Sequence, residues 1–348
     1  MPYRALMLVL SLAAWPGSLK AADALPMAGC VVVVDPGHGG QAYSKSYTGG
    51  TRGVASKLTE GELNLRVGLE LATELRALGA TVHLTREADH RLSREGSSNA
   101  DELHARIDFF EHHHCHFFVS VHHNAGPATA TGHTALYKHN AADDTLYEAI
   151  AQDVNDMLDG SVPGPKRALI KGSYHILRET PIPGTIAESG FLTNRAFDDL
   201  ANRPEFPKVE AAALARGAAK YWAAHKPALI ALREKLAKER ATKPRDPATY
   251  TATALNPEYQ REMADLLAKV APAGKSDAAK AGEYVGALRV ATVKPGATFT
   301  VTATPAAGVI TLAGEVSDRA DHDRLLDVFV AMKLYRIVNE VKLPKVAK

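Results

Sequence analysis

Strong net charge, abundant cysteine and long hydrophobic runs are missing from most of this sequence. Its 348 residues contain 41 Lys and Arg against 39 Asp and Glu, and no long basic stripe is present. A protein that follows a phosphate backbone needs such a stripe, so we expect no nucleic-acid partner. The two cysteines, Cys30 and Cys115, each precede an apolar run. A disulfide is one alternative in an oxidising compartment, but we expect two separate buried side chains, because sequence does not place their Cβ atoms in range.

The N-terminus carries the most apolar run. Arg4 is followed by apolar residues 5–15, then by Pro16, Gly17 and small residues up to Ala24. The run is too short to span a membrane, and its order is typical of a signal peptide. We therefore predict a signal peptide at residues 1–24 and a periplasmic or secreted protein of the cell envelope. A retained anchor and a lipid on Cys30 are the alternatives.

Short apolar runs alternate with helical patterns between residues 29 and 226. This order predicts an α/β domain whose central sheet is mostly parallel and flanked by helices. Strands are expected at residues 31–35, 81–85, 117–122, 135–138 and 185–188, and helices at 59–78, 97–113, 143–158 and 207–225. Leu63, Val67, Leu71 and Leu75 recur at helical spacing and define the face of the first helix that packs on the sheet.

The composition changes after residue 226. Residues 227–283 are rich first in Lys, Arg, Glu and Ala, then in Pro, Thr, Ala and Lys, which indicates a linker with helical pieces. Order is expected to return at residues 284–345, with strands at 299–304, 309–314 and 336–343 and a helix at 318–333. These residues are predicted to form a small α+β C-terminal module.

Two histidines stand where predicted strands end. His38 lies between glycines after the first strand, and glycine leaves room for a ligand beside the imidazole. His122 ends the strand at 117–122, where Phe118, Ser120 and His122 share one face. Ligands of parallel sheets bind beyond the carboxyl ends of the strands, so the two imidazoles should converge there. Two imidazoles at one sheet edge suit zinc.

A third ligand is expected among the glutamates of the first helix. Thr59 and Glu62 fit a capping box, which gives Glu62 a structural role. Glu60 has no capping role and is therefore the candidate ligand, with a solvated first-turn carboxylate as the alternative.

Glu188 ends an apolar run where another core residue would be expected. A buried charge is costly unless it is paired or functional. At the carboxyl end of its strand, Glu188 would be placed to act as a general base beside a zinc site. A structural salt bridge is the alternative.

Several spaced motifs resemble one family in order. They read VVVVDPGHGG at 31–40, LTEGELNL at 58–65, FVSVHHNA at 118–125 and IAESGFLTN at 186–194. Together they resemble the zinc-dependent type-3 N-acetylmuramoyl-L-alanine amidases. The resemblance implies one Zn²⁺ held by His38, Glu60 and His122, with Glu188 as the catalytic glutamate. It also implies peptidoglycan as the substrate, cut at the amide bond between N-acetylmuramic acid and L-alanine.

One residue departs from that family pattern. His123 stands where the family usually has alanine, and strand parity directs it away from His122. Two other functions stay open, because fold does not dictate substrate. One is another zinc-dependent amide hydrolase of the envelope. The other is a non-catalytic peptidoglycan-binding protein with the same fold, which loss of a ligand or of the glutamate would indicate; all four residues are present.

The predicted C-terminal module is similar to the small BON modules of envelope proteins, through its strand pattern at 309–316 and 336–341. That similarity implies contact with the membrane surface or the envelope, and a small packing domain is the alternative.

Further charged residues receive structural interpretations. We expect Arg86 and Arg106 to form structural salt bridges, and the histidines at 112–114 and 116 to be a solvated helix end rather than a metal cluster. His175 is expected to have a surface or packing role. Residues 160–172, which include Lys166, Arg167 and Lys171, form either a basic lip toward acidic stem peptides or a solvated loop.

Overall fold

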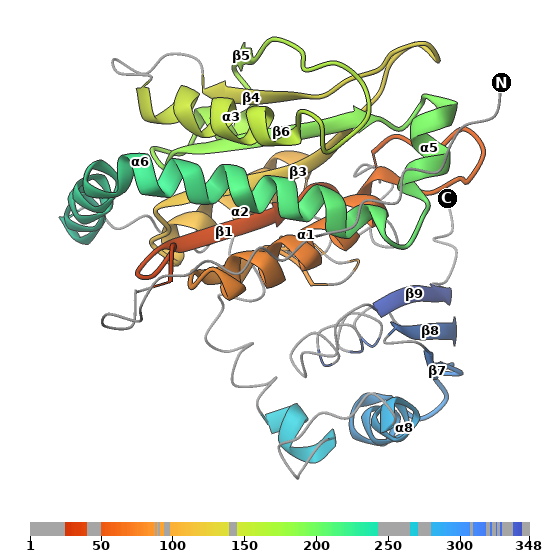
Figure 1. The fold of residues 1–348 in the computed structure, drawn as a ribbon. Coiled ribbons are helices and arrows are strands. Elements are labelled where there is room, and N and C mark those ends of the chain that lie inside the picture. The colour runs from red at the N-terminus through yellow and green to blue at the C-terminus, as the bar shows by residue number, and fades with distance from the viewer. Residues whose placement is uncertain are drawn as a thin grey trace, which may run out of the picture.

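A six-stranded sheet forms the centre of the N-terminal part of the chain in the computed structural model (Figure 1). Its strands are β1 (Val31–Pro36), β2 (Thr81–Leu84), β3 (Phe117–Asn124), β4 (Thr134–Lys138), β5 (Ile170–Gly172) and β6 (Gly184–Phe191), in the spatial order β2-β1-β3-β6-β4-β5. Strands β2, β1, β3 and β6 are parallel neighbours, while β4 runs antiparallel to β6. The predicted α/β fold with a mostly parallel sheet is confirmed.

The structure describes most of the chain in separate ranges. They are 25–39, 50–87, 89, 91–93, 98–138, 145–242, 265–270, 280–306, 309–317, 321, 325, 328 and 337–342. The predicted signal peptide at residues 1–24 lies outside them, as does most of the predicted helix at 318–333. Within the described ranges, no helix is both long enough and apolar enough to cross a membrane.

Helices cover both faces of the sheet (Figure 1). They are α1 (Glu60–Ala77), α2 (Asn99–His112), α3 (Thr145–Leu158), α4 (His175–Arg178), α5 (Arg195–Ala201) and α6 (Phe206–Thr242). Helices α1, α3 and α6 pack in one core with Val32 and Val34, whereas α2 and α4 pack in a second core with Val33. The alternation follows from the two-residue period of a strand. Cys30 belongs to the first core and Cys115 to the second, and both are free thiols.

Helix α1 places the first-turn glutamates. Thr59 is its N-cap and accepts a hydrogen bond from the backbone N–H of Glu62 (3.2 Å), as predicted. The Glu62 carboxylate also pairs with Arg66 one turn further along. An arginine at i+4 offers a charged donor on the same helix face. The predicted packing face is confirmed, since Leu63, Leu71 and their periodic partners are buried.

Helix α6 joins two segments that the sequence predicted separately. A closing helix was expected to end near residue 225, with helical pieces after residue 226, but one helix continues through Pro227 to Thr242, and its end turns away from its first part in Figure 1. Proline removes one helical hydrogen bond and bends the helix. Leu229 is fully buried in the first core and Leu236 packs against the second, so burial holds the segment helical despite the proline.

The C-terminal residues build a separate core. Helix α8 (Ala281–Thr292) precedes a three-stranded sheet of β7 (Thr302–Ala306), β8 (Val309–Glu315) and β9 (Ile337–Lys342). Strand β8 is antiparallel to β7 and parallel to β9, and Leu288, Ile310 and Leu312 are among the buried residues. The three strands lie close to their predicted positions, but α8 was not predicted; it begins at the end of the predicted linker and lies mostly in the predicted module. The similarity to BON modules stays a prediction.

Candidate metal centre and catalytic glutamate

The three predicted ligands come from three segments that meet at the carboxyl ends of the strands. His38 follows β1, Glu60 is the first residue of α1 and His122 lies in β3. His38 adopts a positive φ of 60°, which is uncommon for a residue other than glycine. Arg106 Nη2 donates to the carbonyl oxygen of His38 (2.7 Å) and helps to hold that turn.

Both imidazoles converge on the same carboxylate oxygen. Glu60 Oε1 lies 3.1 Å from His38 Nε2 and 2.9 Å from His122 Nδ1. One ligand atom from each residue lies within 4.8 Å of the others. In the part of the chain that the structure describes, this is the one group of three His, Cys, Asp or Glu residues with such spacing. Two nitrogens and one carboxylate oxygen match a catalytic zinc donor set, so these residues fit zinc.

Glu60 is held as an ionised and oriented carboxylate. Burial by itself would raise the pKa of this carboxyl, but hydrogen bonds from His122 and His38 outweigh burial and hold the pKa well below its usual range. Its Oε2 accepts from the backbone N–H of Thr51 (3.0 Å). Gly50 has a φ of +75°, and a Cβ there would come within 2.2 Å of Glu60 Oε2. The approach of this loop to Glu60 therefore requires glycine.

Glu188 lies beside the cluster, as predicted. It is the register partner of His122 in the parallel pair β3–β6. Its Oε2 is buried and has no hydrogen-bond partner among the described residues. Burial, together with the nearby Glu60 carboxylate, raises the pKa of Glu188 to about 8. A carboxyl group with a pKa near neutrality can both accept and release a proton.

The family match covers this whole site. Residues 32–220, which make up more than half of the chain, match the Amidase_3 family of N-acetylmuramoyl-L-alanine amidases. That range contains all four predicted site residues. The chain belongs to this amidase family.

Individual relatives agree with the family match. The chain is 29% identical over 205 residues to the germination-specific N-acetylmuramoyl-L-alanine amidase of Bacillus subtilis strain 168, covering 57% of this chain and 82% of that protein. It is 26% identical over 197 residues to the probable cell wall amidase LytH of Staphylococcus epidermidis (57% and 60% covered). The CwlD amidase of Clostridioides difficile, solved with the GerS lipoprotein, has the same fold, with a TM-score of 0.50 and 24% identity (56% and 99% covered).

Two buried arginines support the loop that carries His38 in the amidase domain. Arg106 pairs with Asp35 and Glu102, so its predicted salt bridge is confirmed. Arg86 donates to carbonyl oxygens, from Nε to Pro36 (2.8 Å) and from Nη2 to Gly37 (2.9 Å) and Gly61 (2.6 Å).

Asp35 is a site residue that the sequence analysis missed. It is buried and accepts from Thr85 Oγ1 (2.7 Å) and Ser120 Oγ (2.7 Å) as well as from Arg106. Burial would raise the pKa of this carboxyl, but Arg106 and the two hydroxyls outweigh it, and the pKa is lowered. An aspartate at the end of an apolar strand is the same signal that pointed to Glu188.

His123 faces away from His122, as strand parity predicted, but the sequence did not reveal its partners. Its ring nitrogens lie 2.7 Å from Asn64 Oδ1 and 2.9 Å from Glu210 Oε2. All three residues are buried. Burial would lower the pKa of His123, but Glu210 outweighs it and the pKa is raised. A glutamate within the alanine-rich start of α6 was the signal for this contact.

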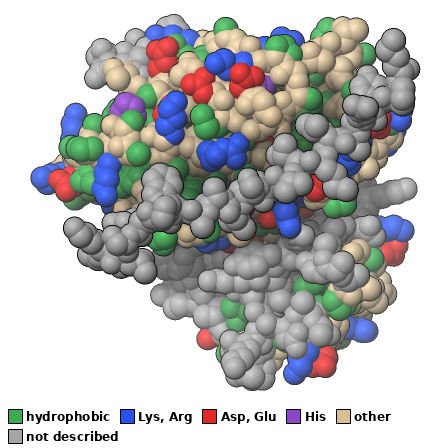
Figure 2. Space-filling model, viewed as in Figure 1, with side chains coloured by type: hydrophobic (Ala, Val, Ile, Leu, Met, Phe, Trp, Pro, Cys, Tyr) green, Lys and Arg blue, Asp and Glu red, His purple; other side chains and the backbone are tan. Residues whose placement is uncertain are grey.

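The predicted basic lip has partners within the domain. Lys166 Nζ pairs with Asp156 (2.9 Å), and the Arg167 guanidinium lies over the Phe191 ring at 4.7 Å. His175 begins α4, and its ring contacts that of His104 at 4.5 Å between centroids, which agrees with a packing role. On the face shown in Figure 2, described basic side chains lie among acidic ones.

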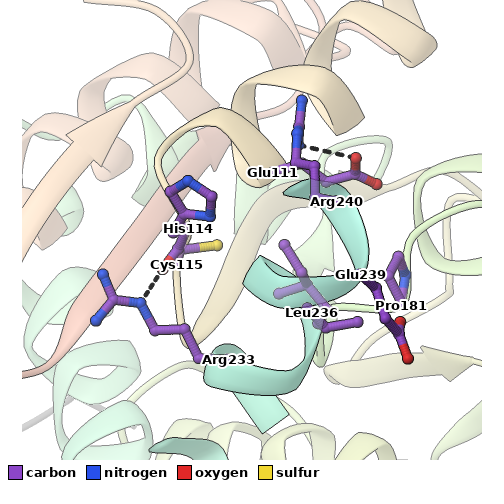
Figure 3. Close-up of a pocket in the computed structure, with 9 residues that line it drawn as sticks. Glu111, His114, Cys115, Pro181, Arg233, Leu236, Glu239 and Arg240 are labelled. Atoms are coloured by element: carbon purple, nitrogen blue, oxygen red, sulfur yellow. Dashed lines mark hydrogen bonds and ion pairs between the residues drawn. The ribbon is translucent and has the colours of Figure 1, made fainter. Parts of the chain in front are cut away.

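A pocket of about 230 Å³ lies at the opposite end of the sheet (Figure 3). It lies at the amino ends of β3 and β6, with Cys115, Ile182 and Leu236 as apolar lining and Arg233 and Arg240 among its charged residues. None of the four site residues lines it.

The nearby histidine run differs from its prediction. His116 is buried rather than solvated, because its Nδ1 accepts from the backbone N–H of Val31 (2.9 Å) and its ring packs against Trp222. His113 is half-buried and stacks on His83 at 3.8 Å, whereas His112 and His114 are exposed as expected.

Proposed function

We propose that this protein is a zinc-dependent N-acetylmuramoyl-L-alanine amidase of the cell envelope. It would hydrolyse the amide bond between N-acetylmuramic acid and L-alanine in peptidoglycan. The observation that carries the proposal is the convergence of His38 and His122 on Glu60, with Glu188 directly beside them, in a chain of the amidase family.

His38 Nε2, Glu60 Oε1 and His122 Nδ1 are the atoms that would hold one Zn²⁺. Bound there, zinc supplies a Lewis acid for the substrate carbonyl and lowers the pKa of water. The ionised state of Glu60 favours a cation at this position, and the hydrogen bond from Thr51 keeps its second oxygen turned away from the imidazoles.

Glu188 would carry the proton in the reaction. Its carboxylate accepts a proton from the attacking water and then delivers that proton to the nitrogen of the departing L-alanine. Burial and the nearby Glu60 carboxylate raise the pKa of Glu188 to about 8, and a cation bound nearby would favour the ionised form at neutral pH. The unpartnered Oε2 supports this role, because a structural salt bridge would have satisfied it.

The cell envelope is the location that fits this substrate. The relative LytH is a probable cell wall amidase, and the N-terminal sequence has the order of a signal peptide. A contact between the C-terminal module and the envelope or membrane surface remains part of the proposal, based on its similarity to BON modules.

Digestion of purified peptidoglycan, followed by mass spectrometry, tests the function. The proposal expects free N-terminal L-alanine on the released peptides and a free lactyl carboxyl group on muramic acid. New termini within the glycan or within the peptide would contradict it. Binding to peptidoglycan without any new termini would instead indicate a non-catalytic binding protein, and cleavage of other envelope amides would indicate a different amide hydrolase.

A further inference from the structure

Three buried polar side chains lie behind the candidate metal ligands. Asn64 comes from α1, His123 from β3 and Glu210 from α6, and each is at most 1% exposed. Asn64 lies one helical turn after Glu60, and His123 directly follows His122. The three side chains therefore lie on, or next to, the elements that carry the ligands, although none of them belongs to the donor set.

The orientation of Glu60 depends on the backbone at residue 123. Glu60 Oε1 accepts from the backbone N–H of His123 (3.3 Å) and also faces both ligand imidazoles. A displacement of residue 123 would therefore move the shared carboxylate relative to His38 and His122.

The His123 ring is held at both of its nitrogens. Asn64 Nδ2 donates to the carbonyl oxygen of Gly37 (3.1 Å), so Asn64 Oδ1 is left to accept from His123 Nδ1 at 2.7 Å. Glu210 Oε2 accepts from His123 Nε2 at 2.9 Å. With a polar partner at each nitrogen, the orientation of the ring is fixed between Asn64 and Glu210.

The same network also contacts the loop that carries His38, the third candidate ligand. Gly37 immediately precedes His38, and a Cβ at position 37 would lie 2.0 Å from His122 Nε2. The hydrogen bond from Asn64 to Gly37 therefore fixes the backbone where His38 and His122 approach each other. Through Asn64 and His123, the network touches the segments of all three ligands.

We propose that Asn64, His123 and Glu210 form a buried clamp that positions His38, Glu60 and His122, so that Glu210 sets zinc affinity without contacting the ion. The inference rests on the zinc centre of the proposed function. Residues that orient metal ligands from behind typically contribute roughly 10–100-fold to metal affinity. Glu210 is thus a positioning residue on the helix that closes the domain.

Zinc affinity of the full chain, measured by competition with a chromophoric chelator, tests the clamp. The variants are Glu210→Gln, His123→Gln and the double variant, which keep side-chain volume and hydrogen-bonding groups. Each single variant should raise the Kd for zinc by roughly 10–100-fold. The double variant should show little further loss, because the two residues act in one network. Saturating zinc should restore kcat toward the wild-type value.

Asn155→Ala is the matched control. It breaks a buried hydrogen bond between His133 Nδ1 and Asn155 Oδ1 (2.8 Å) that involves no candidate ligand. It should lower the thermal midpoint but leave the Kd for zinc unchanged. A wild-type Kd in either single variant would overturn the clamp, as would an equal loss of affinity in Asn155→Ala. If the wild-type chain itself fails to bind zinc, the zinc centre and the clamp are both wrong.

Discussion

Histidines gather at both ends of the central sheet, but the two ends differ in what surrounds them. At the carboxyl ends of the strands, His38 and His122 converge on the Glu60 carboxylate. At the amino ends, His113 stacks on His83, and His116 packs against Trp222. A shared and oriented carboxylate, rather than the number of histidines, distinguishes the candidate metal centre from the packed imidazoles at the other end.

Electrostatics separates the two ends further. The ionised Glu60 carboxylate places negative charge at the first end. At the second end, burial lowers the pKa of His114, and the neighbouring Arg240 and Arg233 guanidinium groups lower it further. Positive charge from arginines repels a cation, so this end should remain free of zinc even though its histidines are neutral.

Metal removal should produce the largest difference between the two ends. A chelator should abolish peptidoglycan hydrolysis, and one equivalent of zinc should restore it, because the donor set at the carboxyl ends is the one that fits zinc. Zinc per chain can be measured by atomic absorption. The double substitution His112→Ala/His114→Ala at the other end should leave the stoichiometry at one. Full turnover in metal-free protein, or a second zinc lost with these histidines, would break the distinction.

Glu188→Gln should have the next largest effect. The amide keeps the size of the side chain but cannot accept a proton, so turnover should fall by roughly 10²–10⁴-fold. Zinc content and the thermal midpoint should stay near the wild-type values, because Glu188 is not among the three converging ligands. Loss of zinc in this variant would make Glu188 a fourth ligand. Retained activity would remove it from the mechanism.

The neighbouring glutamates Glu60 and Glu62 form a matched pair on one helical turn. Glu60→Ala removes a ligand and should weaken zinc binding by more than the roughly 10–100-fold typical of an outer partner. Glu62→Ala removes a partly exposed ion pair with Arg66 and should cost at most about 0.5 kcal/mol of stability, with zinc affinity unchanged. Zinc titration and denaturant unfolding of both variants check this. Equal loss of zinc in the two variants would contradict the assigned ligand.

The four candidate site residues stand out in the sequence because each interrupts a pattern at a strand or helix end. His38 and His122 end apolar strands, Glu188 breaks an apolar run, and Glu60 stands beside a capping pair. The clamp was not predictable in this way. His123 lies 59 positions from Asn64 and 87 from Glu210, and sequence periodicity carries no information about such pairings.

The fold shows the same limit. Strand β5 and helices α4 and α5 were missed, because three to seven residues are too few for a hydrophobic period to be recognised. The helical run after residue 226 was not recognised as a continuation of the closing helix, because proline is a local signal while the burial of Leu229 is a tertiary one. Glu62 was assigned to the cap, although Arg66 at i+4 competes for its carboxylate.

The smallest expected effect concerns the packed histidines at the amino ends. Burial lowers the pKa of His113 to about 3, against 6.5 for the free side chain, and His83 adds to the shift. Between these values the unfolded chain binds a proton that the folded chain does not. The stability contributed by neutral His113 is therefore present above pH 6.5 and is lost as the pH falls toward 3.

His113→Phe keeps a ring against His83 but removes this titration. The difference in thermal midpoint, variant minus wild type, should therefore increase as the pH is lowered from 7 to 5. The expected increase is on the order of 2 °C, because the site is only half-buried. His83, His112 and His114 are present in both proteins, so their own titrations largely cancel in the difference. Zinc stoichiometry and turnover should not change. A pH-independent difference in midpoint would show that His113 titrates normally, and a loss of zinc would place a metal ligand at the end of the sheet where we expect none.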